Sequence, residues 1–68
     1  MDFTTRLAVR AVVRGLFGTG VIGDVQVRSI MEELSKGADI QRARGHLSDE
    51  ADLLTLASDI GKDAKLVD

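Results

Sequence analysis

An arginine recurs every fourth residue near the start of the chain, and almost everything between these arginines is apolar. Arg6, Arg10 and Arg14 fall on one narrow stripe, because residues four apart are neighbours on a helical surface. No proline occurs anywhere in the sequence to interrupt a helix. The pattern predicts a helix over residues 3–17, capped at its start by Asp2 or Thr4.

The apolar residues of this segment cover well over half of the helix circumference. A helix on the surface of a small monomer needs an apolar stripe of only about 100°. Two short helices of the same chain would leave part of so wide an arc uncovered, so we expect this helix to contact another chain. The candidate interface consists of Leu7, Val9, Val12, Val13, Leu16 and Phe17, with Arg6, Arg10 and Arg14 beside them.

A second helix is predicted over residues 25–36. Its apolar side chains follow the spacing i, i+3, i+4, i+7, at Val27, Ile30, Met31 and Leu34. Asp24 is placed to cap its start, and Gly37 is placed for the left-handed turn at its end. Residues 38–47 then form a connector.

A third helix is predicted over residues 49–66. Ser48 precedes it as N-cap, and acidic residues in the first turn suit the helix dipole. One face of this helix is apolar, and this register continues through Gly61, where the helix is expected to loosen. The apolar face consists of Leu53, Leu56, Ala57, Ile60, Ala64 and Val67.

Together these segments predict an all-α, three-helix fold with a glycine-rich loop at 18–24. In this fold residues 1–68 form one small domain. The second and third helices pack through Ile30, Met31 and Leu34 against Leu53, Leu56 and Ile60. The first helix lies partly outside this pair. A hairpin around Gly23–Asp24 is an alternative for residues 21–27.

Composition limits how such a chain gains stability. A domain of 68 residues buries only about 60% of the surface that its unfolded chain exposes. There is no cysteine and one histidine, which excludes disulfides and a zinc site, and no other metal is expected. Tight helix packing or association with another protein must supply the remaining stability.

Charge is unevenly distributed along the chain. Residues 1–31 carry four arginines against two aspartates, whereas residues 32–68 carry nine acids against five bases. We expect the arginine stripe to pair with acids such as Glu32, Glu33, Asp59 or Asp63, in the same chain or in a neighbouring one.

No motif in the sequence supports catalysis or cofactor binding. Residues 18–23 match the phosphate-binding pattern G-x-G-x-x-G, but a helix precedes them where a strand is required, and the chain is too short for a nucleotide-binding fold. His46 lies in a connector with no nucleophile that can be assigned to it. We therefore expect no enzymatic activity and no cofactor.

The sequence favours a non-catalytic structural or adaptor subunit that acts through protein contacts, either as a homo-oligomer or inside a larger assembly such as a capsid. One alternative is a helix-turn-helix DNA-binding regulator, which the acidic third helix and a pI near 5.2 disfavour. Another is a protein that lies on membranes through its arginine-striped helix. No secretory signal or membrane span is visible, so we expect a cytoplasmic protein or an assembly formed there.

Overall fold

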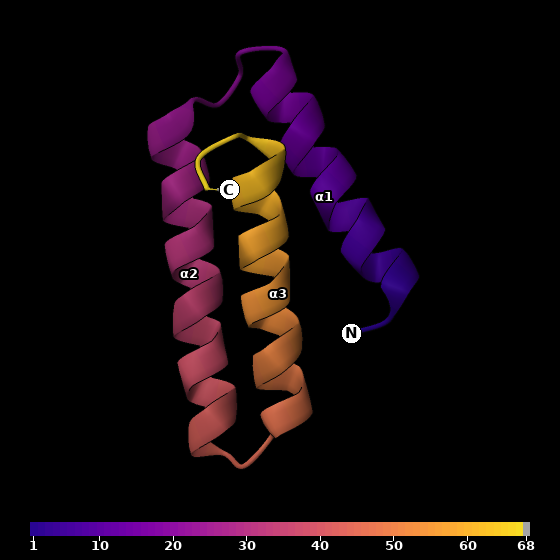
Figure 1. Cartoon of the computed structure of the whole chain (residues 1–68), viewed down its shortest axis with the longest axis vertical. Coiled ribbons are helices and arrows are strands. Elements are labelled where there is room, and N and C mark those ends of the chain that lie inside the picture. The colour runs from indigo at the N-terminus through magenta and orange to yellow at the C-terminus, as the bar shows by residue number, and fades with distance from the viewer. Residues whose placement is uncertain (68) are drawn as a thin grey trace.

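The chain folds into three helices, as Figure 1 shows for a computed structural model that describes residues 1–67. Helix α1 spans Phe3–Gly18, α2 spans Asp24–Ala43 and α3 spans Leu47–Asp63. Helices α2 and α3 run antiparallel, and α1 lies on the other side of α3, running in the same direction as α3 (Figure 1). The predicted all-α fold is confirmed, and residues 1–67 contain no strand of the alternative hairpin.

The core lies where the three helices converge. Ile60 and Leu56 of α3 are almost completely buried, together with Val27 of α2 and Val13 of α1. Half-buried apolar side chains from all parts of the chain pack around this cluster: Val9, Phe17, Ile22, Ile30, Met31, Leu34 and Leu66. The predicted packing of α2 on α3 is therefore confirmed.

Helix α2 is longer than the sequence analysis predicted. Neither the predicted end at Gly37 nor the connector over 38–47 is correct, because the helix continues to Ala43. Ala38 is fully buried, and a Cβ placed on Gly37 would lie 3.5 Å from the Cδ1 atom of Leu53. These two small residues lie against α3, so Gly37 has a packing role in the helix interior.

The predicted boundaries of α3 are also wrong. The helix begins at Leu47, and its N-cap is His46, whose side chain makes no capping bond, so Ser48 is not the cap. It ends at Asp63, three residues before the predicted end. Gly61 is buried inside the helix, beneath Met31, so the expected loosening at Gly61 does not occur.

All three helices end in the same left-handed turn. Gly20 and Gly45 have φ angles of 79° and 77°, a conformation that favours glycine because it has no Cβ. After α3 the equivalent position is Lys65, with φ 58°. The amide two residues beyond each helix-terminal cap donates back to the last turn, as Leu66 N does to Gly61 O at 2.8 Å.

Candidate interaction surface

One side of α1 packs on α3 and contributes to the core. Val13 is 7% exposed, and Val9 and Phe17, one helical turn to either side of it, are half-buried against the core cluster. These positions are four residues apart, so they form a single stripe facing α3. The packed side of α1 is therefore narrow compared with the apolar arc of the helix.

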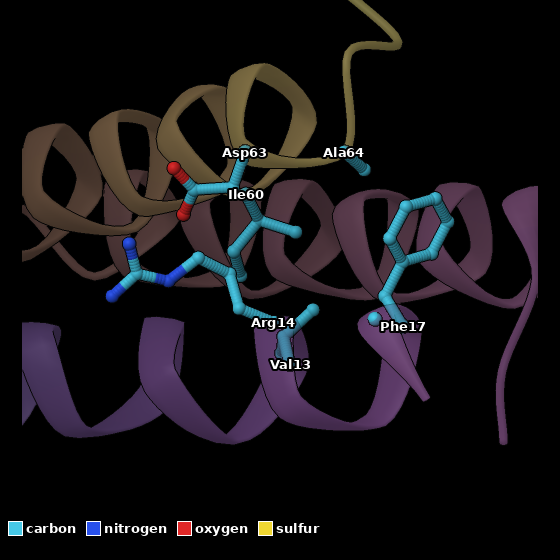
Figure 2. Close-up of a pocket in the computed structure, with 7 residues that line it drawn as sticks. Val13, Arg14, Phe17, Ile60, Asp63 and Ala64 are labelled. Carbon is cyan, nitrogen blue, oxygen red and sulfur yellow. The ribbon is translucent and has the colours of Figure 1, made fainter. Parts of the chain in front are cut away.

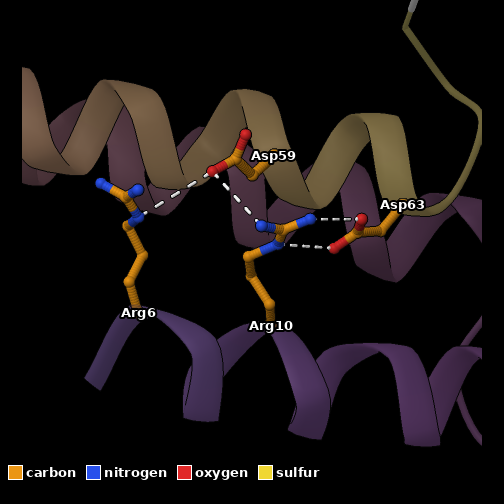
Figure 3. A network of polar contacts seen from close by, with 4 residues as sticks. All are labelled: Arg6, Arg10, Asp59 and Asp63. Carbon is orange, nitrogen blue, oxygen red and sulfur yellow. Dashed lines mark hydrogen bonds and ion pairs between the residues drawn. The ribbon is translucent and has the colours of Figure 1, made fainter. Parts of the chain in front are cut away.

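Ion pairs flank this stripe and connect α1 to α3 (Figure 3). The guanidinium of Arg10 donates two hydrogen bonds to Asp63, from Nε at 2.9 Å and from Nη2 at 2.8 Å. Asp59 lies between the two arginines, 3.8 Å from Arg10 Nη1 and 4.0 Å from Arg6 Nε. At the start of the chain, the amino group of Met1 lies 2.8 Å from Asp52.

The sequence predicted that this stripe would pair with acids, and two of the four candidate acids do so within the same chain. Asp59 and Asp63 bind Arg6 and Arg10, whereas Glu32 and Glu33 lie near Lys36 on α2. The spacing of the two aspartates, four residues apart, matches the spacing of the arginines, so the two helices align in one register.

The contact with Arg10 also changes the acidity of its partner. The two hydrogen bonds from Arg10 hold the pKa of Asp63 below its ordinary value of 3.8, against the opposing effect of partial burial. The charges of Arg10 and Arg14 act in the same direction. Asp63 is therefore fully ionised at neutral pH, and its acceptor capacity is directed at Arg10.

The opposite side of α1 is exposed and carries no charged side chain. We call it the outer face, and it consists of Leu7, Ala8, Ala11, Val12, Gly15 and Leu16, all exposed. Val12 is 62% exposed although it is apolar and lies in the middle of the helix. A row of six uncharged residues over the exposed length of a helix is unusual, because such positions normally carry polar side chains.

The structure divides the nine predicted interface residues into four groups. Val9, Val13 and Phe17 pack against their own chain, and Arg6 and Arg10 are paired with aspartates of α3. Leu7, Val12 and Leu16 lie on the outer face. Arg14 is exposed and forms no ion pair with any of residues 1–67.

Sequence reasoning missed the small members of the outer face. Ala8, Ala11 and Gly15 recur three and four residues apart and lie between the larger side chains. The spacing was visible in the sequence, but only the position of α3 shows which half of the apolar arc remains exposed. Phe3, 65% exposed at the start of α1, was missed as well.

A groove lies between the last turns of α1 and the end of α3 (Figure 2). It has a volume of about 240 Å³ and an apolar floor formed by Val13, Phe17, Ile60 and Ala64. Gly18 forms part of its wall, and Arg14 and Asp63 lie at its edge. Since Asp63 is bound to Arg10, Arg14 is the edge residue whose charge is not directly paired within residues 1–67.

The histidine that the sequence analysis considered lies in the turn between α2 and α3. His46 is exposed after α2, where its Nδ1 atom lies 2.8 Å from Gln41 Oε1. Within residues 1–67, no three histidine, aspartate or glutamate side chains gather to hold a metal ion. The helices of that part of the chain are all too short or too polar to cross a membrane.

No family model, curated protein or solved structure matches this chain. The geometry of α1 therefore carries the functional argument.

Proposed function

We propose that the protein is a non-catalytic structural or adaptor subunit that binds another protein surface through the outer face of α1. The observation that carries the proposal is the exposure of this face, which has no charged residue over about three turns of helix. Removing such a surface from water is favourable by about 25 cal/mol per Å² of apolar area. A surface of this kind on a small domain is typical of a protein contact site.

The ion pairs of α1 weaken the two alternative functions. A membrane-surface helix or a DNA-binding segment needs arginines that are available to phosphates. Arg6 and Arg10 are instead paired with aspartates, which place negative charge beside them. Helices α2 and α3 are also antiparallel (Figure 1), whereas a helix-turn-helix motif joins its helices at about 90–120°.

The test is a charge introduced on the outer face. Val12→Asp places a carboxylate at an exposed position, so the isolated chain should keep its helix content and thermal midpoint. In size-exclusion chromatography of an extract of the natural source, the unmodified chain should elute in a larger complex than the Val12→Asp variant.

A matched control uses the same substitution on another helix. Val25 of α2 is 75% exposed, so Val25→Asp adds the same charge outside the outer face. This variant should elute with the unmodified chain. If Val12→Asp also stays in the larger complex, the outer face does not bind the partner.

A further inference from the structure

We propose that the groove between α1 and α3 is a second protein-binding site, which takes a partner segment carrying a large apolar side chain next to an acidic one. The apolar side chain enters the groove, and the carboxylate binds Arg14. This inference goes beyond the proposed function, because the outer face points away from α3 and shares no residue with the groove. Two separate surfaces on one helix allow the chain to hold two partners at once.

The groove has the size and shape of a site for one side chain. Pockets that bind small molecules measure about 300–1,000 Å³. The groove measures about 240 Å³ and is open to solvent. Three of its four floor residues, Val13, Ile60 and Ala64, are buried parts of the core, so the floor is formed before a partner arrives. A single large apolar side chain of a protein partner fits such a space, as the anchor residues of interfaces do.

The ion pairs beside the groove leave one positive charge in excess. Three arginines of α1 face two aspartates of α3, and Arg6 and Arg10 are the two that are paired (Figure 3). Arg14 lines the groove and forms no ion pair with any of residues 1–67 (Figure 2). The unpaired charge therefore lies beside the apolar floor, where an acidic partner gains from it.

The other charges near the groove favour an acidic partner as well. Lys62 precedes Asp63 in the sequence and Lys65 follows it two residues later, and both lysines are exposed. Neither lysine forms an ion pair within residues 1–67. Asp63 is the one acid that lines the groove, and both of its oxygens accept hydrogen bonds from Arg10. An incoming carboxylate therefore meets a net positive surface.

The experiment is a titration of the isotope-labelled chain with three blocked hexapeptides, followed through the amide NMR shifts of Arg14, Phe17 and Ala64. The first peptide is Gly-Gly-Phe-Glu-Gly-Gly, which we expect to bind with a millimolar dissociation constant. Replacing its Glu by Gln should weaken binding roughly two- to fivefold, because a partly exposed ion pair contributes little. Replacing its Phe by Ala should weaken binding roughly tenfold or more, because the anchor is lost.

Variants of the chain separate the charge of the groove from its shape. Arg14→Gln removes the charge and keeps much of the side chain, so the Glu and Gln peptides should bind this variant equally. Gly18→Leu fills the groove from a position where an added Cβ meets nothing within 4 Å, and it should weaken both peptides roughly tenfold. If Gly18→Leu lowers the helix content, Arg14→Gln decides the outcome.

Two matched controls make the same changes elsewhere. Arg28→Gln removes an exposed arginine from α2, and Gly15→Leu adds a leucine to the outer face, where an added Cβ also meets nothing within 4 Å. Neither control should change the dissociation constant of any peptide.

The proposal is overturned if the groove amides do not shift, or if the Glu and Gln peptides bind the unmodified chain equally. Tighter binding of dodecanoate than of the Glu peptide at the same amides would assign the groove to a fatty acid. Shifts of these amides on concentrating the chain alone would assign it to a second copy. None of these results bears on the outer face, because Val12→Asp alters no residue of the groove.

Discussion

Helix α3 is held by two neighbours in different ways. Its contact with α2 is apolar and extended, with Val27 and Ala38 fully buried on one side and Leu56 and Ile60 on the other. Among residues 1–67, one ion pair links these two helices near their connecting turn, between Arg42 and Glu50 at 3.6 Å.

The contact of α3 with α1 buries much less. Val13 is the one residue of α1 that is buried, and charged groups occupy the positions beside it. Apolar burial is the main favourable term in folding, whereas partly exposed ion pairs contribute little net stability. The α2–α3 pair therefore provides most of the stability, and the ion pairs of α1 mainly fix its register on α3.

The largest expected effect comes from shortening a buried side chain, in the core of the α2–α3 pair or in the contact of α1 with α3. Ile60→Ala should destabilise the chain by about 2–5 kcal/mol, because Ile60 is fully buried and contacts both sides of the core. Val13→Ala should cost about 1–2 kcal/mol and act mainly on α1. Urea denaturation measures the loss of unfolding free energy in Ile60→Ala. Amide hydrogen exchange of each helix shows which helix Val13→Ala destabilises.

The comparison predicts that Val13→Ala accelerates exchange in α1 while the central amides of α2 and α3 stay protected. Equal acceleration in all three helices would mean that α1 and the α2–α3 pair unfold as one unit.

A smaller loss of stability is expected where α2 and α3 approach most closely, at Gly61. A Cβ on Gly61 would lie 2.7 Å from Met31 Cε, so Gly61→Val should cost about 1–3 kcal/mol through overpacking. The cost should shrink in a Met31→Ala background, where the obstructing side chain is absent. Thermal unfolding of the four chains gives the coupling.

Gly37→Ala is the matched control on the opposite helix. The added Cβ would meet Leu53 at an ordinary contact distance of 3.5 Å, so the gain in helix propensity should stabilise the chain by about 0.5–1 kcal/mol. If both glycine substitutions destabilise to a similar extent, the close contact at Met31 is not the cause.

The smallest expected effect is on the pH dependence of stability, through the Arg10–Asp63 pair between α1 and α3. The pKa of Asp63 is lowered in the folded chain, so its contribution to stability is complete above the ordinary value of 3.8 and is lost as the pH falls through the lowered pKa. Asp63→Asn removes this contribution. As the pH falls below 4, the free energy of unfolding of this variant should therefore decrease less than that of the unmodified chain.

Thermal midpoints of both chains are measured from pH 7 down to pH 2. The midpoint of Asp63→Asn should lie a few degrees below that of the unmodified chain at neutral pH, and the difference should be smaller in acid. Glu33→Gln removes a carboxylate from the exposed pair with Lys36 and should leave the acid dependence almost unchanged. An identical acid dependence for Asp63→Asn and the unmodified chain would show that Arg10 does not stabilise the ionised aspartate.

The sequence alone determined the helical class and the start of α1. The absence of proline, the apolar spacing of residues 27–34 and the cap at Asp2 are local properties, and the structure contains each resulting element. The apolar residues assigned to the contact between α2 and α3 were also identified from spacing alone, since a one-sided stripe has only one face to bury.

Tertiary structure decided the features that depend on a neighbouring helix. Gly37 resembles a helix end in sequence, but packing against α3 keeps it inside α2. The apolar arc of α1 does not reveal which half will be buried, because either half satisfies the same periodicity. The aspartates of α3 select one side by pairing with Arg6 and Arg10, and this choice leaves Val12 and the rest of the outer face exposed.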